Sequence, residues 1–259
     1  MTYTWVALLL AIGFFVAMLG AQEIGHRLGT RQEHLDPAGA HSGTGSVEGA
    51  VFALLGLLVA FTFSGAAARF DARRHLIVEE ANDIGTAYLR IDLLSTADQP
   101  RMRDLFRRYL DARLEVYENM EDAAITQAAI RRATDIQGEI WPQAVAGCEA
   151  VQPRPCTIML LPVLNAMFDV ATTRSVALEM HVPRIAVWLL FAIGLACGIL
   201  SGYSMASGRR KWAHVVVFAA ATALTIYVIL DLEFPRLGLI RVDSFDQVLV
   251  DVRSSMDPR

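Results

Sequence analysis

Residues 47–95 read VEGAVFALLGLLVAFTFSGAAARFDARRHLIVEEANDIGTAYLRIDLLS, and they contain the two patterns from which the fold is predicted. From Val47 to Ala68 it is almost entirely apolar or small, and it is long enough to cross a hydrocarbon core of ~30 Å. After Arg69 apolar residues recur at three-, four- and seven-residue steps, which predicts an amphipathic helix. Its apolar stripe comprises Phe70, Ile77, Ala81, Ile84, Tyr88 and Ile91. Its expected solvent face comprises Asp71, Arg73, Arg74, Glu79, Glu80, Asp83 and Asp92. Because no helix breaker separates the two parts, we expect one helix that leaves the bilayer and becomes the first helix of a water-exposed bundle.

The composition supports a membrane location. Of 259 residues, 54% are hydrophobic and only 19% are charged, which is too apolar for an ordinary soluble domain. The lipid bilayer is therefore the first expected partner. The net charge of −4 contains no long run of one sign, so nucleic acid is not expected to bind.

Further apolar runs predict three more spans, at 5–21, 185–206 and 214–230. Helical patterns at 101–119, 123–146 and 158–180 predict a bundle, with loops expected at 22–45 and 147–157. The predicted fold is an all-α integral membrane protein with four transmembrane helices and a helical extramembrane bundle inserted between the second and third. The predicted segments are a first transmembrane pair (1–68), the extramembrane domain (69–182), a second transmembrane pair (183–231) and an amphipathic tail (232–259).

Two observations address the orientation of the chain. Both short loops are basic, through Arg27 and Arg31 in one and 209–211 in the other, which favours a cytoplasmic face for them. Arginines near the opposite surface weaken this count. Cys148 and Cys156 flank a proline-rich loop and could close a disulfide, which would place the helical domain outside the cytoplasm. Two free thiols in a cytosolic loop are the alternative.

Several residues in the membrane segments are candidates for function. Gly194, Gly198 and Gly202 share one helix face and predict close packing against a helix of this chain or of a neighbouring subunit. Glu48 and Asp231 lie at the ends of apolar runs, where they could mark an ion path or rest in the interface. Residues 60–64 alternate aromatic and hydroxyl side chains, which could line a constriction or pack in the core.

A polar stripe lies beside the apolar stripe on the helix after Arg69, and it comprises Asn82, Thr86 and Arg90. The last helix of the extramembrane domain, which is expected to return beside this one, contains Asp169 and Arg174. A buried pair between Arg90 and Asp169 is the structural hypothesis, and an anion-attracting vestibule is the functional one.

Neither metal nor catalytic chemistry is expected. The first loop carries histidines at 26, 34 and 41, but their spacing matches no compact ligand pattern. A glycine-rich phosphate loop, a nucleophile elbow, an HExxH pair and a CxxC are missing from the sequence, so we predict no cofactor and no enzymatic activity.

Four runs of sequence resemble the bacterial bestrophin-like membrane family, whose function is uncharacterised. They are Ser46–Phe52, Ala60–Gly65, Glu79–Asn82 and Ile84–Arg90; Leu164-Asn165, Asp169 and Gly238–Val242 are similar to that family as well. The resemblance implies four membrane helices with a helical extramembrane domain, in a bacterial inner membrane.

More remotely, through true bestrophins, the resemblance implies an oligomeric anion channel whose second membrane helix lines the pore. Phe61, Thr62 and Phe63 would then form the neck. True bestrophins keep the helical domain in the cytosol, which conflicts with the orientation inferred from charge and cysteines. The leading hypothesis is an oligomeric channel that conducts small anions. The alternative is a non-conducting membrane scaffold or sensor whose helical domain binds a partner protein.

Overall fold

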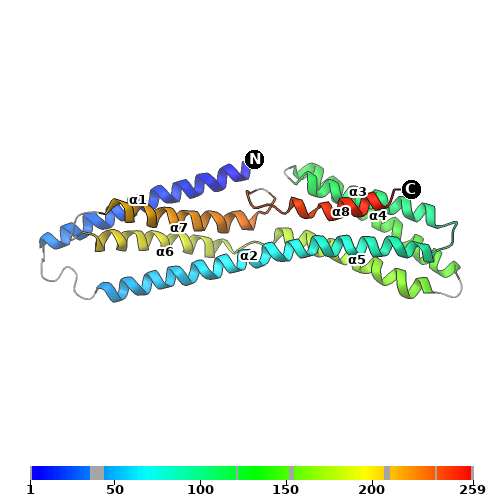
Figure 1. Cartoon of the computed structure of the whole chain (residues 1–259), viewed down its shortest axis with the longest axis horizontal. Helices are drawn as coiled ribbons and strands as arrows, with labels where there is room; N and C mark the ends of the chain where they lie inside the picture. The colour runs from blue at the N-terminus through cyan, green and yellow to red at the C-terminus, as the bar shows by residue number, and fades with distance from the viewer. Residues whose placement is uncertain are drawn as a thin grey trace. The chain divides into compact units, whose positions relative to one another are not determined.

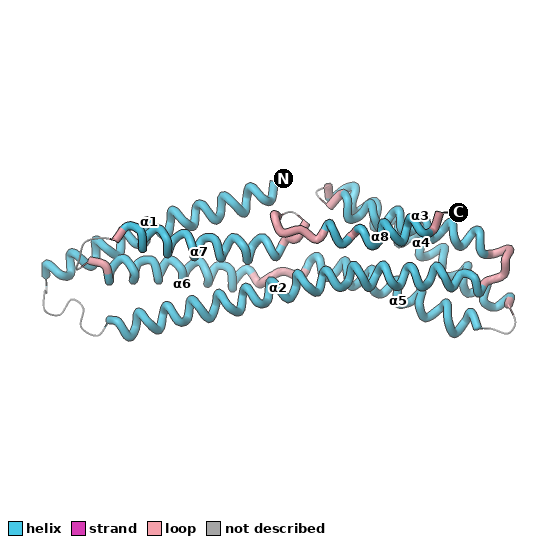
Figure 2. Tube along the Cα trace, viewed as in Figure 1, coloured by secondary structure: helices cyan, strands magenta, loops and turns pink. Residues whose placement is uncertain are grey.

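Helices make up most of the part of the chain that the structure describes. This structure is a computed structural model, and it describes residues 2–35, 44–120, 122–151, 155–206, 211–236 and 238–257. Within these ranges Figure 2 shows helices, turns and loops and no strand. Four helices are long and apolar enough to cross a membrane. The all-α class and the four candidate spans are therefore confirmed.

The chain divides into two compact units. Unit 1 consists of Met1–Phe70 and His181–Ile240. Its helices are α1 (Thr2–Leu35), the first half of α2 (Thr44–Arg90), α6 (Arg184–Ser204) and α7 (Trp212–Glu233). In Figure 1, α1 runs beside α6 and α7, and these helices make the closest packing of the unit. The unit is held together by an apolar core that includes Phe14, Met18, Leu55, Leu190 and Ile226.

Helix α1 is longer than the sequence suggested. A loop was expected from Gln22, but the helix continues to Leu35, so that prediction is wrong for residues 22–35. The polar residues of this segment did not break the helix, because one face of it packs against α6 at Gly25 and Gly29. Gln22 is also buried, and its amide donates to the carbonyl oxygen of Val215 in α7 at 3.1 Å.

Helix α2 extends from Thr44 to Arg90 without interruption at Arg69, and a short 3₁₀ turn, Ile91–Leu93, follows it. The stretch expected to form one helix therefore does so. Its first half belongs to unit 1 and its second half to unit 2.

Unit 2 consists of Asp71–Met180 and Arg241–Arg259. It contains the second half of α2 with α3 (Gln99–Glu118), α4 (Ala123–Ala150), α5 (Pro155–Glu179), η2 (Asp243–Phe245) and α8 (Gln247–Ser255). Its largest fully buried side chains include Ile77, Ile84, Phe106, Tyr109, Ile140, Leu160 and Leu164. From Ile77 onward, the apolar stripe read from the sequence thus faces this core, whereas Phe70 packs against the core of unit 1.

Two segment boundaries differ from the expectation. The loop expected at 147–157 is shorter, because α4 continues to Ala150 and α5 already begins at Pro155, a residue that suits the first turn of a helix. The tail expected as one segment is shared, since Leu232–Ile240 belongs to unit 1 and the remainder to unit 2.

Candidate functional site

The membrane part of α2 has one packed face and one open face. Its packed face places Phe52, Leu55 and Ala66 in the core of unit 1. On the opposite side Gly49, Ala53, Gly56 and Ala60 are exposed, and a Cβ atom added at either glycine would meet no described atom within 4 Å. Exposed Leu54, Leu57 and Phe61 form an apolar ridge on this side, at three- and four-residue steps.

The three residues considered for a pore neck do not share one face. Phe61 is 69% exposed and lies on the ridge, whereas Thr62 is 8% exposed and its hydroxyl donates to the Leu58 carbonyl oxygen at 2.8 Å. Phe63 is 43% exposed and lies seven residues after Gly56, so it shares the glycine side of the open face. Phe61 and Phe63 therefore stand at opposite edges of the open face, and only Thr62 belongs to the packed one.

Glu48 lies near the beginning of α2 and is half-buried. The Ser204 hydroxyl donates to its Oε2 at 2.6 Å, and Glu48, Ser201 and His214 line part of a cavity of about 770 Å³ between α2, α6 and α7. The carboxylate is therefore held by a neighbouring helix of its own unit.

Asp231 has a structural environment. It is fully buried, and its two carboxylate oxygens accept hydrogen bonds from the backbone N–H groups of Leu239 (2.9 and 3.1 Å) and Ile240 (2.7 Å). A Cβ added at Gly238 would lie 2.1 Å from its Oδ1, so glycine is required there. Asp231 thus fixes the chain after α7, which favours the structural interpretation over an ion path.

The glycines of α6 pack against α1 of the same chain. A Cβ at Gly194 would lie 2.9 Å from the Phe14 ring, and one at Gly202 would lie 2.0 Å from the Gln22 carbonyl oxygen. Gly198 lies against Met18 and Ala21. Helix α1 also presents a glycine to α6, because a Cβ at Gly25 would lie 1.9 Å from the Ile199 carbonyl oxygen. Backbones approach this closely only where both helices present small residues.

This packing predicts a clear difference between two glycines of α1. Gly25→Ala should destabilise the protein by about 1–3 kcal/mol, because the new methyl group meets backbone that cannot move aside. Gly20→Ala is the matched control, since a Cβ there meets no described atom within 4 Å, and it should leave the stability unchanged or slightly raised. Thermal unfolding in detergent measures both; equal melting temperatures would contradict the α1–α6 contact.

In unit 2 the expected pair of Arg90 and Asp169 is not formed among the described residues. Arg90 donates instead to the Met159 carbonyl oxygen, and Asp169 is exposed. Asn82 is exposed and Thr86 is half-buried, so the polar stripe faces outward. The hypothesis of a buried link at these positions is wrong, because the long Arg90 side chain reaches backbone on α5 before it reaches the carboxylate.

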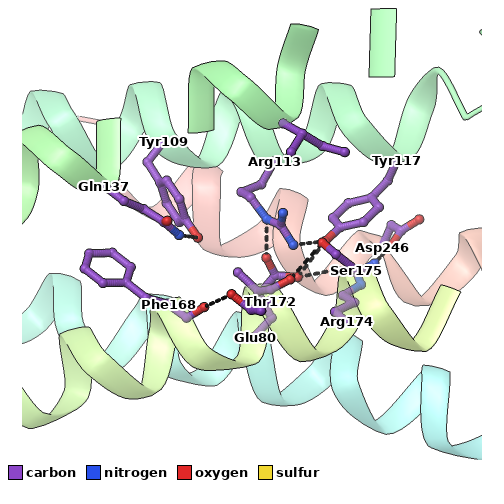
Figure 3. Close-up of polar contacts among 12 residues, drawn as sticks. Glu80, Tyr109, Arg113, Tyr117, Gln137, Phe168, Thr172, Arg174, Ser175 and Asp246 are labelled. Atoms are coloured by element: carbon purple, nitrogen blue, oxygen red, sulfur yellow. Dashed lines mark hydrogen bonds and ion pairs between the residues drawn. The ribbon is translucent and has the colours of Figure 1, made fainter. Parts of the chain in front are cut away.

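A different set of charged residues is buried in unit 2. Figure 3 shows Glu80 of α2 between Arg113 of α3 and Arg174 of α5, with Tyr117 and Asp246 beside them. Glu80 is 0% exposed; Arg113 donates to its Oε1 at 2.5 Å, and the Tyr117 hydroxyl donates to its Oε2 at 3.0 Å. Arg174 donates to Glu80 and also to Asp246 at 2.9 Å. We call these five residues the charge cluster.

The charge cluster is electrically balanced and fully bonded. Burial opposes ionisation of Glu80, but the Arg113 and Arg174 guanidinium groups outweigh it and hold the pKa of this carboxyl below its ordinary value. Burial raises the pKa of the neighbouring Tyr109 to about 12, so this phenol stays neutral; it accepts a hydrogen bond from Gln137 at 3.2 Å. Because every charge has a partner, the cluster joins helices and offers no free acid or base for catalysis.

Sequence reasoning placed Glu80 and Arg73 on the solvent face, and both assignments are wrong. Glu80 lies three residues after Ile77 and four before Ile84, so it shares their buried side. Arg73 is also buried, and it donates to the carbonyl oxygens of Ala177 (3.1 Å) and Met180 (2.7 Å) near the end of α5. The helical spacing could have revealed Glu80, whereas its partners lie too far along the chain to be inferred.

Cys148 and Cys156 are joined by a disulfide between the end of α4 and the start of α5. Cys197 is a buried free cysteine in α6. No group of three metal-ligating side chains is found among the described residues. His41 of the first loop and Arg209 and Arg210 of the basic loop lie outside the described residues.

Four membrane-capable helices define a multi-pass membrane protein. A comparison with models of known protein families identifies the family. The model of the Bestrophin-like domain matches residues 12–244, and the chain belongs to this family. The resemblance seen in the sequence is thereby confirmed. No curated protein and no solved structure matches the chain.

Proposed function

We propose that the protein is an oligomeric channel for small anions, with the open face of α2 turned toward the pore. The observation that carries this proposal is that this face is apolar and unpacked in unit 1: Leu54, Leu57 and Phe61 are exposed on it, and a Cβ added at Gly49 or Gly56 would meet no described atom within 4 Å. In lipid, exposed small residues favour association with another helix, because backbones can approach closely there. The Bestrophin-like family is associated with ion channels, which supports the same function.

The second span carries no charge that would select for cations. Between Gly49 and Ala68 the sequence contains no acidic residue and no basic one. Cation channels commonly use rings of carboxylates, and a pore lined by this segment would have none. The carboxylate just before it, Glu48, accepts a hydrogen bond from Ser204 of α6.

Purified protein in planar bilayers tests the proposal. We expect discrete conductance, with a reversal potential in a KCl gradient close to the equilibrium potential of chloride. Gel filtration with light scattering should give the molar mass of an oligomer, as expected for a ring of subunits. Silent bilayers with verified insertion, together with a monomer in detergent, would contradict the channel and favour a scaffold or sensor that binds a partner protein.

For the orientation we propose that the helical unit lies outside the cytoplasm of a bacterial inner membrane. The Cys148–Cys156 disulfide supports this, because disulfides persist in oxidising compartments. The basic residues Arg27 and Arg31 on the opposite face support it as well.

Cysteine labelling checks the orientation. Gln127→Cys introduces a thiol at an exposed position of α4, and Arg31→Cys introduces one in the last turns of α1. With an impermeant thiol reagent on intact spheroplasts, the first variant should react and the second should react only after the membrane is opened. The reverse pattern would place the helical unit in the cytosol.

A further inference from the structure

A second cavity of unit 1 lies where α6 begins and α7 ends. It encloses about 450 Å³ and is lined by residues from α1, α6 and α7 and by the segment before α6. This volume falls in the range of sites that hold small organic ligands, about 300–1,000 Å³. Neither the proposed pore face nor the charge cluster contributes to it.

The lining of this cavity is polar at one end and apolar at the other. Arg184 and Glu233 stand at the helix ends, whereas Trp188 and Phe191 lie one and two turns further into α6. Leu10 of α1 adds to the apolar part. At ~1.5 Å per residue the polar and apolar ends are separated by about 10 Å along α6. Because α6 is part of a candidate span, we expect the apolar end within the hydrocarbon and the polar end at its boundary.

The polar end carries an available positive charge. The Glu233 carboxylate is already bonded: Arg69 donates to its Oε1 at 3.0 and 2.5 Å, and the Val182 N–H donates to its Oε2 at 3.1 Å. Arg184 is exposed and has no hydrogen bond or ion pair within the described ranges. The acid of the cavity is therefore neutralised, and the guanidinium group of Arg184 is left to bind a ligand.

We propose that this cavity binds an acidic phospholipid of the surrounding membrane. An acyl chain occupies the apolar part beside Trp188 and Phe191, and the acidic headgroup accepts hydrogen bonds from Arg184. An arginine provides paired donors for phosphate oxygens, and interfacial basic residues attract anionic lipids. Entry needs no opening of the fold, because Trp188 on the wall of the cavity is 70% exposed. The proposal is independent of ion conduction.

Photo-crosslinking in nanodiscs tests this site with the full-length protein. The probes are phosphatidylglycerol and phosphatidylcholine carrying the same diazirine-labelled acyl chain. We expect adducts on residues 187–191 with phosphatidylglycerol at several times the level of phosphatidylcholine. Arg184→Gln should lower the phosphatidylglycerol signal about tenfold, as expected for one lost charge-assisted hydrogen bond. Arg31→Gln, which removes an exposed arginine of α1, is the matched control and should leave it unchanged.

A second variant distinguishes lipid bound inside the cavity from lipid bound on the outer surface of α6. Val187→Trp fills the cavity and should reduce labelling by both lipids, whereas Arg184→Gln should affect only the acidic one. Equal labelling by the two lipids, an unchanged signal in Arg184→Gln, or full labelling of a folded Val187→Trp protein would each overturn the proposal. Competition by unlabelled phosphatidylglycerol supports a phospholipid; competition by oleate or inorganic phosphate alone would contradict it.

Discussion

Phe61→Ala is expected to increase ion passage about tenfold. Phe61 is the most exposed large side chain on the open face of α2, where it lies on a ridge with Leu54 and Leu57. A ring of such side chains, one from each subunit, would make a narrow apolar constriction, and these constrictions block ions by excluding water. A reduction of about 1.4 kcal/mol in the cost of hydrating the ring corresponds to a factor of ten. Single-channel recording in planar bilayers measures the change.

Phe63→Ala is the comparison variant for this experiment. It removes the same side chain two positions further along α2, at the other edge of the open face. Its conductance should rise less than that of Phe61→Ala, because Phe63 is 43% exposed and Phe61 is 69% exposed. A larger effect of Phe63→Ala than of Phe61→Ala would mean that the glycine edge of the open face, and not the ridge, forms the constriction.

Glu80→Gln is expected to destabilise the protein by about 3–5 kcal/mol. The substitution leaves Arg113 and Arg174 buried without the carboxylate that compensates them, and uncompensated buried charges are costly. Thermal unfolding of the purified protein, followed by circular dichroism, measures the loss. A melting temperature equal to that of the unmodified protein would show that the charge cluster does not hold α2, α3 and α5 together.

Glu79→Gln is the neighbouring control, because Glu79 is exposed and its loss should change the stability little. The two variants should also differ in their pH dependence. The pKa of Glu80 is lowered in the folded protein. Its contribution to the free energy of unfolding is therefore complete above the ordinary carboxyl pKa of 4.5, and it is lost as the pH falls through the lower pKa of the folded protein. This acid-induced loss should persist in Glu79→Gln and disappear in Glu80→Gln.

The largest features of the fold follow directly from the sequence. Four apolar runs predicted four membrane-capable helices, and the apolar stripe after Arg69 predicted which side of α2 faces the core of unit 2. These predictions succeed because hydrophobic burial repeats along a helix with a fixed period, so local spacing reports it. The close packing at Gly198 was likewise predicted from the sequence, because Gly194 and Gly202 stand four residues on either side of it.

Other features depend on contacts between distant segments. Gln22–Leu35 looked like a loop, and its packing against α6 keeps it helical. Glu80 looked solvated, and it is buried because Arg113 and Arg174 approach it from α3 and α5, 33 and 94 residues away in the chain.

The helices, the number of candidate spans and the family could be predicted from the sequence, since these depend on hydrophobic pattern and local motifs. Contacts between distant segments were needed to learn that Arg90 and Asp169 remain apart, that Asp231 holds the chain after α7 and that Phe61 lies on an open face. The physical reason is that a polar side chain can be buried only where partners from other helices compensate its lost hydration, and local spacing carries no record of those partners.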